Sequence, residues 1–146
     1  MFTDTRSNYT SNREWFNNVL GDMDVVLCHT SALECLGQFP GYVNEKQIDV
    51  YATTREPYEN INWYLVNGFD GIEIVNIAGL RCTSFNQTIN DMLRDYDMID
   101  EQSLVQALAS FYYRNGESFK GLQIAPQYSD KFNSLKDWVV EFYNYE

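Results

Sequence analysis

The sequence contains one histidine, three cysteines and three prolines among 146 residues, and it has no long hydrophobic run. The single histidine, His29, leaves no second imidazole to serve as the base for a serine or cysteine nucleophile elsewhere. Three cysteines without C-x-x-C spacing predict neither a disulfide framework nor a zinc site, and they fit a reducing compartment. Since no segment approaches the roughly 18 apolar residues of a membrane span, and the N-terminus lacks an apolar signal core, we expect a soluble, cytoplasmic protein with no membrane contact.

Positive charge is also scarce, because 10 Lys and Arg residues stand against 21 Asp and Glu, giving a net charge of -11. The basic residues are scattered, so we expect no patch that holds phosphate and no direct contact with nucleic acid. Glycine-rich phosphate loops do not occur, and no H-x-x-x-H or D-x-D spacing lies near His29. We therefore expect no catalytic residue, no metal site and no cofactor. An acidic domain of this kind favours a protein partner with a basic surface.

Hydrophobic residues make up 45% of the chain and aromatic residues 16%, enough for a packed core. The patterns predict one α+β domain over residues 11–146, preceded by a flexible N-terminus over residues 1–10. The domain is expected to have N-terminal helices, a small, mostly antiparallel sheet with a hairpin over 72–84, and three C-terminal helices. Expected caps are Ser11, Ser84 and Asp100, and expected helix stops are Gly21 and Gly37.

The stretch "CHTSALECLG", residues 28–37, places the histidine beside a cysteine. Consecutive side chains point in different directions on a helix or a strand, so Cys28 and His29 cannot easily serve each other in catalysis. Ser31 and Glu34 have the S-x-x-E spacing of a capping box, which predicts that Ser31 caps a helix. We therefore interpret the stretch as scaffold, with His29 as a packing or hydrogen-bonding residue.

This stretch, the strand in "IDVYATT", the hairpin that ends in "GLRCTS", and the later "TINDML" and "LVQALASFYYRNG" together resemble the C-terminal domain of AbiEi-family antitoxins from type IV toxin–antitoxin systems of abortive infection. The resemblance covers about residues 24–114. Family members carry an N-terminal winged-helix domain that binds the operator. Too few residues precede the matching region for such a domain, and Gln87 stands where the family usually has Arg. The resemblance implies opposition to a nucleotidyltransferase-like toxin, or regulation of a phage-defence system, without operator binding. The matching positions are His29, Ser31, Ala32, Leu33, Gly37, Thr88, Asp91, Met92, Leu93, Ala107 and Leu108.

The matched helix also suggests a contact between elements. Asp91 lies one helical turn beyond Thr88 and is expected to hold a donor from the hairpin, with Arg81 as the candidate. Such a pair would fix the helix against the sheet.

The expected partner-binding surface is the exposed side of the acidic stretch 90–101 together with surface tyrosines, which suit interfaces. Its residues are Asp91, Asp95, Asp97, Tyr112, Tyr113, Tyr143 and Tyr145.

Two alternatives stay open. An acidic chain can mimic nucleic acid and occupy the basic groove of a nuclease or DNA-binding protein, which would require carboxylates at phosphate-like intervals along one face. A cleft that holds His29, a carboxylate and an ordered ion would instead indicate an enzyme of unrecognised type.

Overall fold

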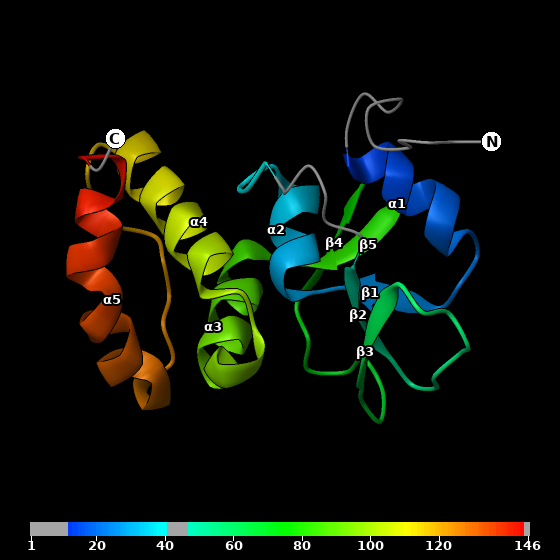
Figure 1. The fold of residues 1–146 in the computed structure, drawn as a ribbon. Coiled ribbons are helices and arrows are strands. Elements are labelled where there is room, and N and C mark those ends of the chain that lie inside the picture. Colours follow the sequence, from blue (N-terminus) through cyan, green and yellow to red (C-terminus); the bar gives the residue numbers. More distant parts are fainter. Residues whose placement is uncertain (1–11, 41–46, 145–146) are drawn as a thin grey trace.

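A five-stranded sheet and three C-terminal helices form the two halves of the protein, and the helix α2 (His29–Leu36) lies between them (Figure 1). The structure is a computed structural model that describes residues 12–40 and 47–144. The expected flexible end at 1–10 and the expected cap Ser11 lie outside the described residues. The elements are α1 Asn12–Leu20, β1 Val25–Leu27, α2 His29–Leu36, β2 Ile48–Ala52, β3 Ile61–Leu65, β4 Ile74–Ile77, β5 Leu80–Thr83, α3 Phe85–Arg94, the 3-10 turn η2 Tyr96–Met98, α4 Glu101–Arg114, η3 Pro126–Tyr128, α5 Ser129–Glu141 and η4 Phe142–Asn144.

The α+β class is confirmed, but the expectation of a mostly antiparallel sheet is wrong. The strand order is β3-β2-β1-β5-β4. β1–β2 and β4–β5 pair antiparallel, whereas β2–β3 and β1–β5 pair parallel. The alternation of apolar and polar residues predicts which face a strand buries but carries no information about its direction. The sheet is therefore mixed, with β3 and β4 at its edges.

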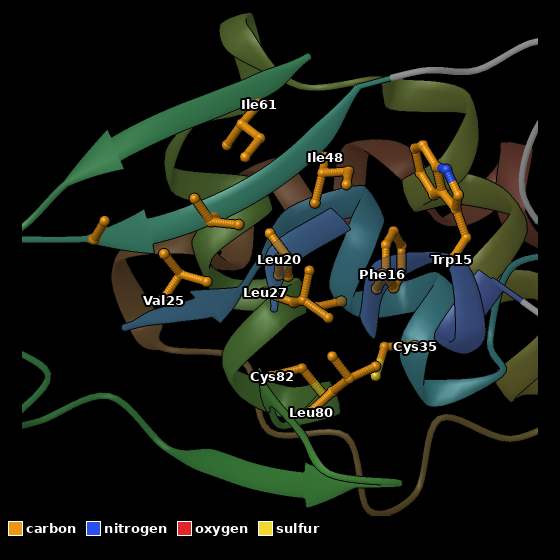
Figure 2. Close-up of a cluster of buried hydrophobic side chains, with 13 residues drawn as sticks. Trp15, Phe16, Leu20, Val25, Leu27, Cys35, Ile48, Ile61, Leu80 and Cys82 are labelled. Carbon is orange, nitrogen blue, oxygen red and sulfur yellow. The ribbon is translucent and has the colours of Figure 1, made fainter. Parts of the chain in front are cut away.

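The two faces of the sheet are covered differently. On one face, α1 and α2 pack a core that contains Phe16, Leu27 and Val50 (Figure 2). On the other face lies a smaller cluster around Val26, Cys28 and Tyr51. A further core joins α2 to the C-terminal helices. Together, α2 and β1 thus contribute side chains to all three clusters.

Most predicted helix ends are confirmed. Gly21 and Gly37 have positive φ angles of 54° and 78° at the ends of α1 and α2. Ser84 and Asp100 accept backbone N–H bonds at the starts of α3 and α4. The prediction that Ser31 caps a helix is wrong, because the N-cap of α2 is Cys28.

α2 begins at His29, one residue after its N-cap Cys28, so Ser31 lies inside its first turn. The Ser31 hydroxyl accepts from the backbone N–H of Asp49 at 2.8 Å instead. It thereby ties α2 to β2.

Candidate functional site

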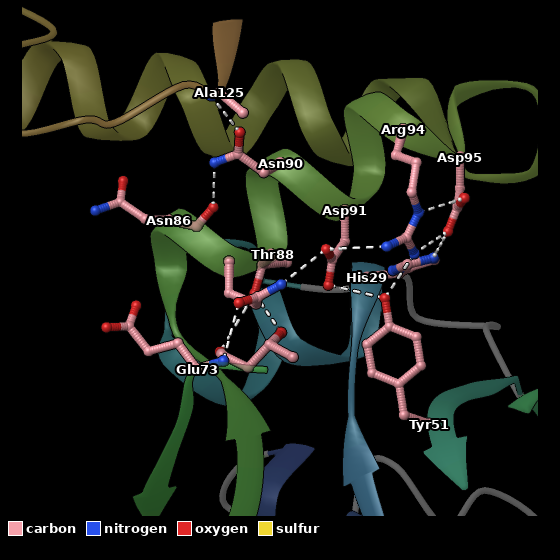
Figure 3. A network of polar contacts seen from close by, with 12 residues as sticks. His29, Tyr51, Glu73, Asn86, Thr88, Asn90, Asp91, Arg94, Asp95 and Ala125 are labelled. Carbon is pink, nitrogen blue, oxygen red and sulfur yellow. Dashed lines mark hydrogen bonds and ion pairs between the residues drawn. The ribbon is translucent and has the colours of Figure 1, made fainter. Parts of the chain in front are cut away.

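A polar network joins α3 to the face of the sheet that α1 does not cover (Figure 3). The Tyr51 hydroxyl donates to Asp91 Oδ2 at 2.8 Å and accepts from Arg94 Nη2 at 2.8 Å. Gln87 donates to the other oxygen of Asp91 at 2.9 Å. Burial, reinforced by Asp91, raises the pKa of Tyr51 well above its ordinary value, so the hydroxyl keeps its proton and stays a donor. The network fixes α3 against β2.

His29 extends this network below the surface. Its imidazole is fully buried, and Nε2 lies 3.0 Å from Asp95 Oδ2. Burial lowers the pKa of His29 against the opposing effect of Asp49 and Asp95, which favours the neutral ring. Nε2–H is then the donor, because an ionised carboxylate only accepts, and Nδ1 has no hydrogen-bond partner among the described residues.

Two further features mark the position of His29. Its φ angle is 52°, in the left-handed region that side chains with a Cβ rarely occupy. The Arg94 guanidinium donates two hydrogen bonds to the Asp95 carboxylate, from Nε to Oδ1 at 2.9 Å and from Nη2 to Oδ2 at 2.7 Å. Burial alone would raise the pKa of Asp95, but Arg94 and His29 outweigh this effect and lower it. The surroundings thus hold His29 in a strained backbone conformation.

A groove of about 600 Å³ opens directly over this network, and we call it the sheet groove. The aromatic residues Tyr51 and Tyr64 line it from the sheet, and Asp91, Arg94 and Asp95 line it from the end of α3. A concave site with aromatic walls and a few converging polar groups is typical of binding sites.

Two residues that border the sheet groove carry large apolar side chains that are exposed to solvent. Leu65, at the end of β3, is 56% exposed, and Met98, at the end of η2, is 67% exposed. They come from elements far apart in the sequence. Asp70 lines the groove as well and is exposed. The groove therefore combines apolar contact area with an excess of carboxylates over its one arginine.

A second cavity of about 540 Å³ lies between α1, α2 and α4, where Arg13 and Arg114 line it together with Glu34. Arg13 Nε donates to the backbone oxygen of Cys35 at 2.7 Å, so this guanidinium already serves to join α1 to α2. The cavity reaches Pro40, beside a segment that the structure does not describe. We take the sheet groove as the candidate site.

The thiol next to His29 lies in an unreactive setting. Cys28 is fully buried, and burial, with Asp49, raises the pKa of its thiol well above the ordinary value. A thiolate is the reactive form of cysteine, so this environment opposes nucleophilic chemistry at Cys28.

The structure brings together some of the predicted motif residues and corrects others. Asp91 is buried, so the expectation that it faces solvent is wrong, and its partner is Tyr51 rather than Arg81. Arg81 instead pairs with Asp24 at 2.6 Å and donates to the backbone oxygen of Val25. Arg81 on β5 points to the same face of the sheet as Tyr51 on β2, but β1 lies between these two strands and Asp91 contacts only β2.

The remaining motif residues hold elements in place. Thr88 is buried and lies 2.6 Å from the Thr83 hydroxyl, which joins α3 to the end of β5. On α2, Ala32 packs in the core beneath α1, and Leu33 packs toward the C-terminal helices.

The predicted partner surface does not form one continuous patch. Asp97 is exposed just before α4, whereas Tyr112 and Tyr113 lie at the far end of that helix. The 14 residues of α4 separate them by about 20 Å. Both tyrosines are half-buried, and the Tyr113 hydroxyl donates to the backbone oxygen of Val140. Asp95 is half-buried and paired, so only Asp97 of these four is a freely exposed side chain.

Sequence reasoning missed Tyr51, Arg94, Leu65 and Met98. The alternation in "IDVYA" did carry a signal for Tyr51, because it places this residue on the face opposite Ile48 and Val50. The pairing of Arg94 with Asp95 and the meeting of Leu65 with Met98 at one groove depend on tertiary structure. No local pattern indicates them.

Two properties apply to the described residues as a whole. Within residues 12–40 and 47–144, no three or more His, Cys, Asp or Glu side chains gather as a metal site would require. In the same part of the chain, every helix is too short or too polar to cross a bilayer.

Comparison with known proteins finds no family model that matches this chain and no curated protein that resembles it in sequence.

Proposed function

We propose that this chain is a non-catalytic protein-interaction domain that binds a partner with a basic surface at the sheet groove. The observation that carries this proposal is the exposure of Leu65 and Met98 on two separate elements that line one groove. Large exposed apolar side chains beside a concavity are typical of protein interfaces. The carboxylates around the groove and the net charge of -11 favour a basic partner.

The resemblance to AbiEi-family antitoxins suggests the kind of partner. On this basis we propose an antitoxin-like role in which the chain opposes a nucleotidyltransferase-like toxin or regulates a phage-defence system. The short motifs on α2 and α3 support the resemblance, and both helices position the groove. The alternative, an acidic mimic of nucleic acid, predicts a nuclease or DNA-binding protein as the partner.

The test is an affinity pull-down of the tagged full chain from the lysate of its native host, followed by binding measurements with the captured protein. We expect a nucleotidyltransferase-like protein. Met98→Lys should weaken its binding at least about tenfold, because it places a charge in an apolar contact. Tyr143→Lys is the matched control, since Tyr143 is 43% exposed and does not line the sheet groove.

The two variants decide between surfaces as well as between functions. If Tyr143→Lys weakens binding and Met98→Lys does not, the tyrosine surface expected from the sequence is the interface and the groove is not. A toxin whose growth inhibition is relieved by the wild-type chain but not by Met98→Lys would support the antitoxin-like role. Capture of a nuclease would contradict that role and support the mimic.

A further inference from the structure

β3 forms one edge of the sheet, and half of its backbone groups point away from β2. The Ile48 N–H donates to the Asn60 oxygen at 2.9 Å, and the Val66 N–H donates to the Ala52 oxygen at 2.9 Å. Backbone groups of alternate residues point to opposite sides of a strand, so Asn62 and Tyr64 also face β2. The residues whose N–H and C=O groups point outward are Ile61, Trp63 and Leu65.

No hydrogen bond between described residues uses these outward groups. The β3 sequence, Ile-Asn-Trp-Tyr-Leu, contains no lysine or proline, the residues that commonly protect an edge from pairing. Trp63 and Leu65 also line the sheet groove, so the free edge and the groove are continuous. β4, at the opposite edge, contributes no residue to the groove.

We propose that the free edge of β3 accepts an extended, basic segment of the partner protein as a sixth strand of the sheet. This proposal rests on the proposed function and specifies how the partner is held. Strand addition draws its affinity from main-chain hydrogen bonds and its specificity from alternate side chains.

The charges around β3 identify the occupant. Glu56 and Glu59 precede the strand and Asp70 follows it, and all three are exposed, whereas the segments that flank β3 carry one basic residue, Arg55. A second copy of this chain would bring the same carboxylates and a net charge of -11 to the edge, which opposes self-pairing. A segment rich in Lys and Arg would instead be attracted.

The two faces of the sheet predict the pattern of the added strand. Ile61, Trp63 and Leu65 direct their side chains to the face that α1 covers, which favours apolar neighbours there. Asn62 and Tyr64 point to the face of the sheet groove, where Asp49 and Asp70 lie. The added strand should therefore alternate apolar residues with Lys or Arg.

Leu65→Pro provides a selective test, because proline lacks the N–H that an added strand would use. The Leu65 N–H points outward, so the bonds between β2 and β3 persist, and Tyr64, the residue before the new proline, is already extended. The control is Leu65→Thr, which also removes the leucine side chain but keeps the N–H and suits a strand. Circular dichroism of both variants checks that the fold is retained.

The probe is a phage-displayed library of short random peptides, panned against the full chain, with the enriched sequences then made synthetically. We expect enriched peptides to alternate apolar residues with Lys or Arg. Their binding should slow hydrogen exchange at the amides of Ile61, Trp63 and Leu65. Leu65→Pro should weaken binding at least about fivefold relative to Leu65→Thr, the effect of losing about one hydrogen bond.

Several results would overturn strand addition. Peptides that bind without protecting these three amides, or equally well to both Leu65 variants, would exclude it while leaving the groove and the proposed function intact. Failure to enrich any alternating basic peptide would also overturn it. A concentration-dependent dimer in sedimentation that Leu65→Pro abolishes would assign the edge to a second copy of the chain instead.

Discussion

At the scale of single residues, His29 links the stability of the protein to pH. Its folded pKa is lowered by burial, so the unfolded chain binds a proton more readily than the folded chain does. The stabilising effect of the neutral ring is complete above the unfolded pKa of about 6.5 and is lost as pH falls below it. Asp95 acts in the same direction at lower pH, because its folded pKa is also lowered.

We therefore expect the melting temperature to be lower at pH 5.5 than at pH 7.5, a range that lies above the titration of ordinary carboxylates at about 4. His29→Asn should flatten this dependence, because asparagine does not titrate, and it tolerates the left-handed backbone that His29 adopts. Thermal unfolding of both proteins across this pH range is the measurement. An equal loss of stability in the variant would show that another group is responsible.

The Tyr51 hydroxyl offers a second prediction at this scale. Tyr51→Phe removes one donor to the buried Asp91 and one acceptor for Arg94, so it should lower the free energy of unfolding by about 1–2 kcal/mol. Tyr64→Phe is the matched control on the neighbouring strand, since no hydrogen bond between described residues uses its hydroxyl. Urea denaturation should leave this control within about 0.5 kcal/mol of wild type. Equal losses in the two variants would contradict a special role for the Tyr51 hydroxyl.

At the scale of elements, the β4–β5 hairpin carries avoidable strain at its turn. Ala78 and Gly79 both have positive φ angles, 53° and 83°, as two-residue hairpin turns require. Ala78→Asn should raise the free energy of unfolding by about 0.5–1 kcal/mol, because asparagine accepts this conformation more readily than alanine. Gly79→Ala should lower it by a similar amount, although the site has open space for a methyl group. Urea denaturation measures both variants, and changes of the same sign would contradict strain at Ala78.

Helices and strands are predictable from the sequence where a local rule decides the outcome. Ser84 caps α3 because its hydroxyl accepts from an N–H three residues ahead, as the capping-box spacing predicts. Ser31 has the same spacing, but the chain enters α2 directly from β1, and tertiary structure uses its hydroxyl for Asp49. The direction of β3 and the partner of Asp91 also depend on contacts distant in sequence. The hairpin and the helices were predictable, whereas the groove was not.

At the scale of the whole molecule, α2 carries the connection between its two halves. Ala32 and Cys35 pack into the core under α1, while Leu33, one residue from Ala32, packs into the core of the C-terminal helices. Because this short helix packs in both cores, unfolding of either core removes packing contacts from the other. The sheet groove depends on this connection, because β3 lies in one half and Met98 precedes α4 in the other.

We therefore expect the chain to unfold in one cooperative transition, even though it holds two main clusters of buried side chains. Leu33→Ala should lower the free energy of unfolding by about 2–4 kcal/mol, because it leaves a cavity at a fully buried position. NMR signals from both cores, followed through urea denaturation, should shift to the same lower midpoint. Leu36→Ala, at a half-buried position on the same helix, is the control and should cost less. If Leu33→Ala moved only the signals of the C-terminal helices, the halves would unfold independently, and a partner bound at the sheet groove would then have to order their junction itself.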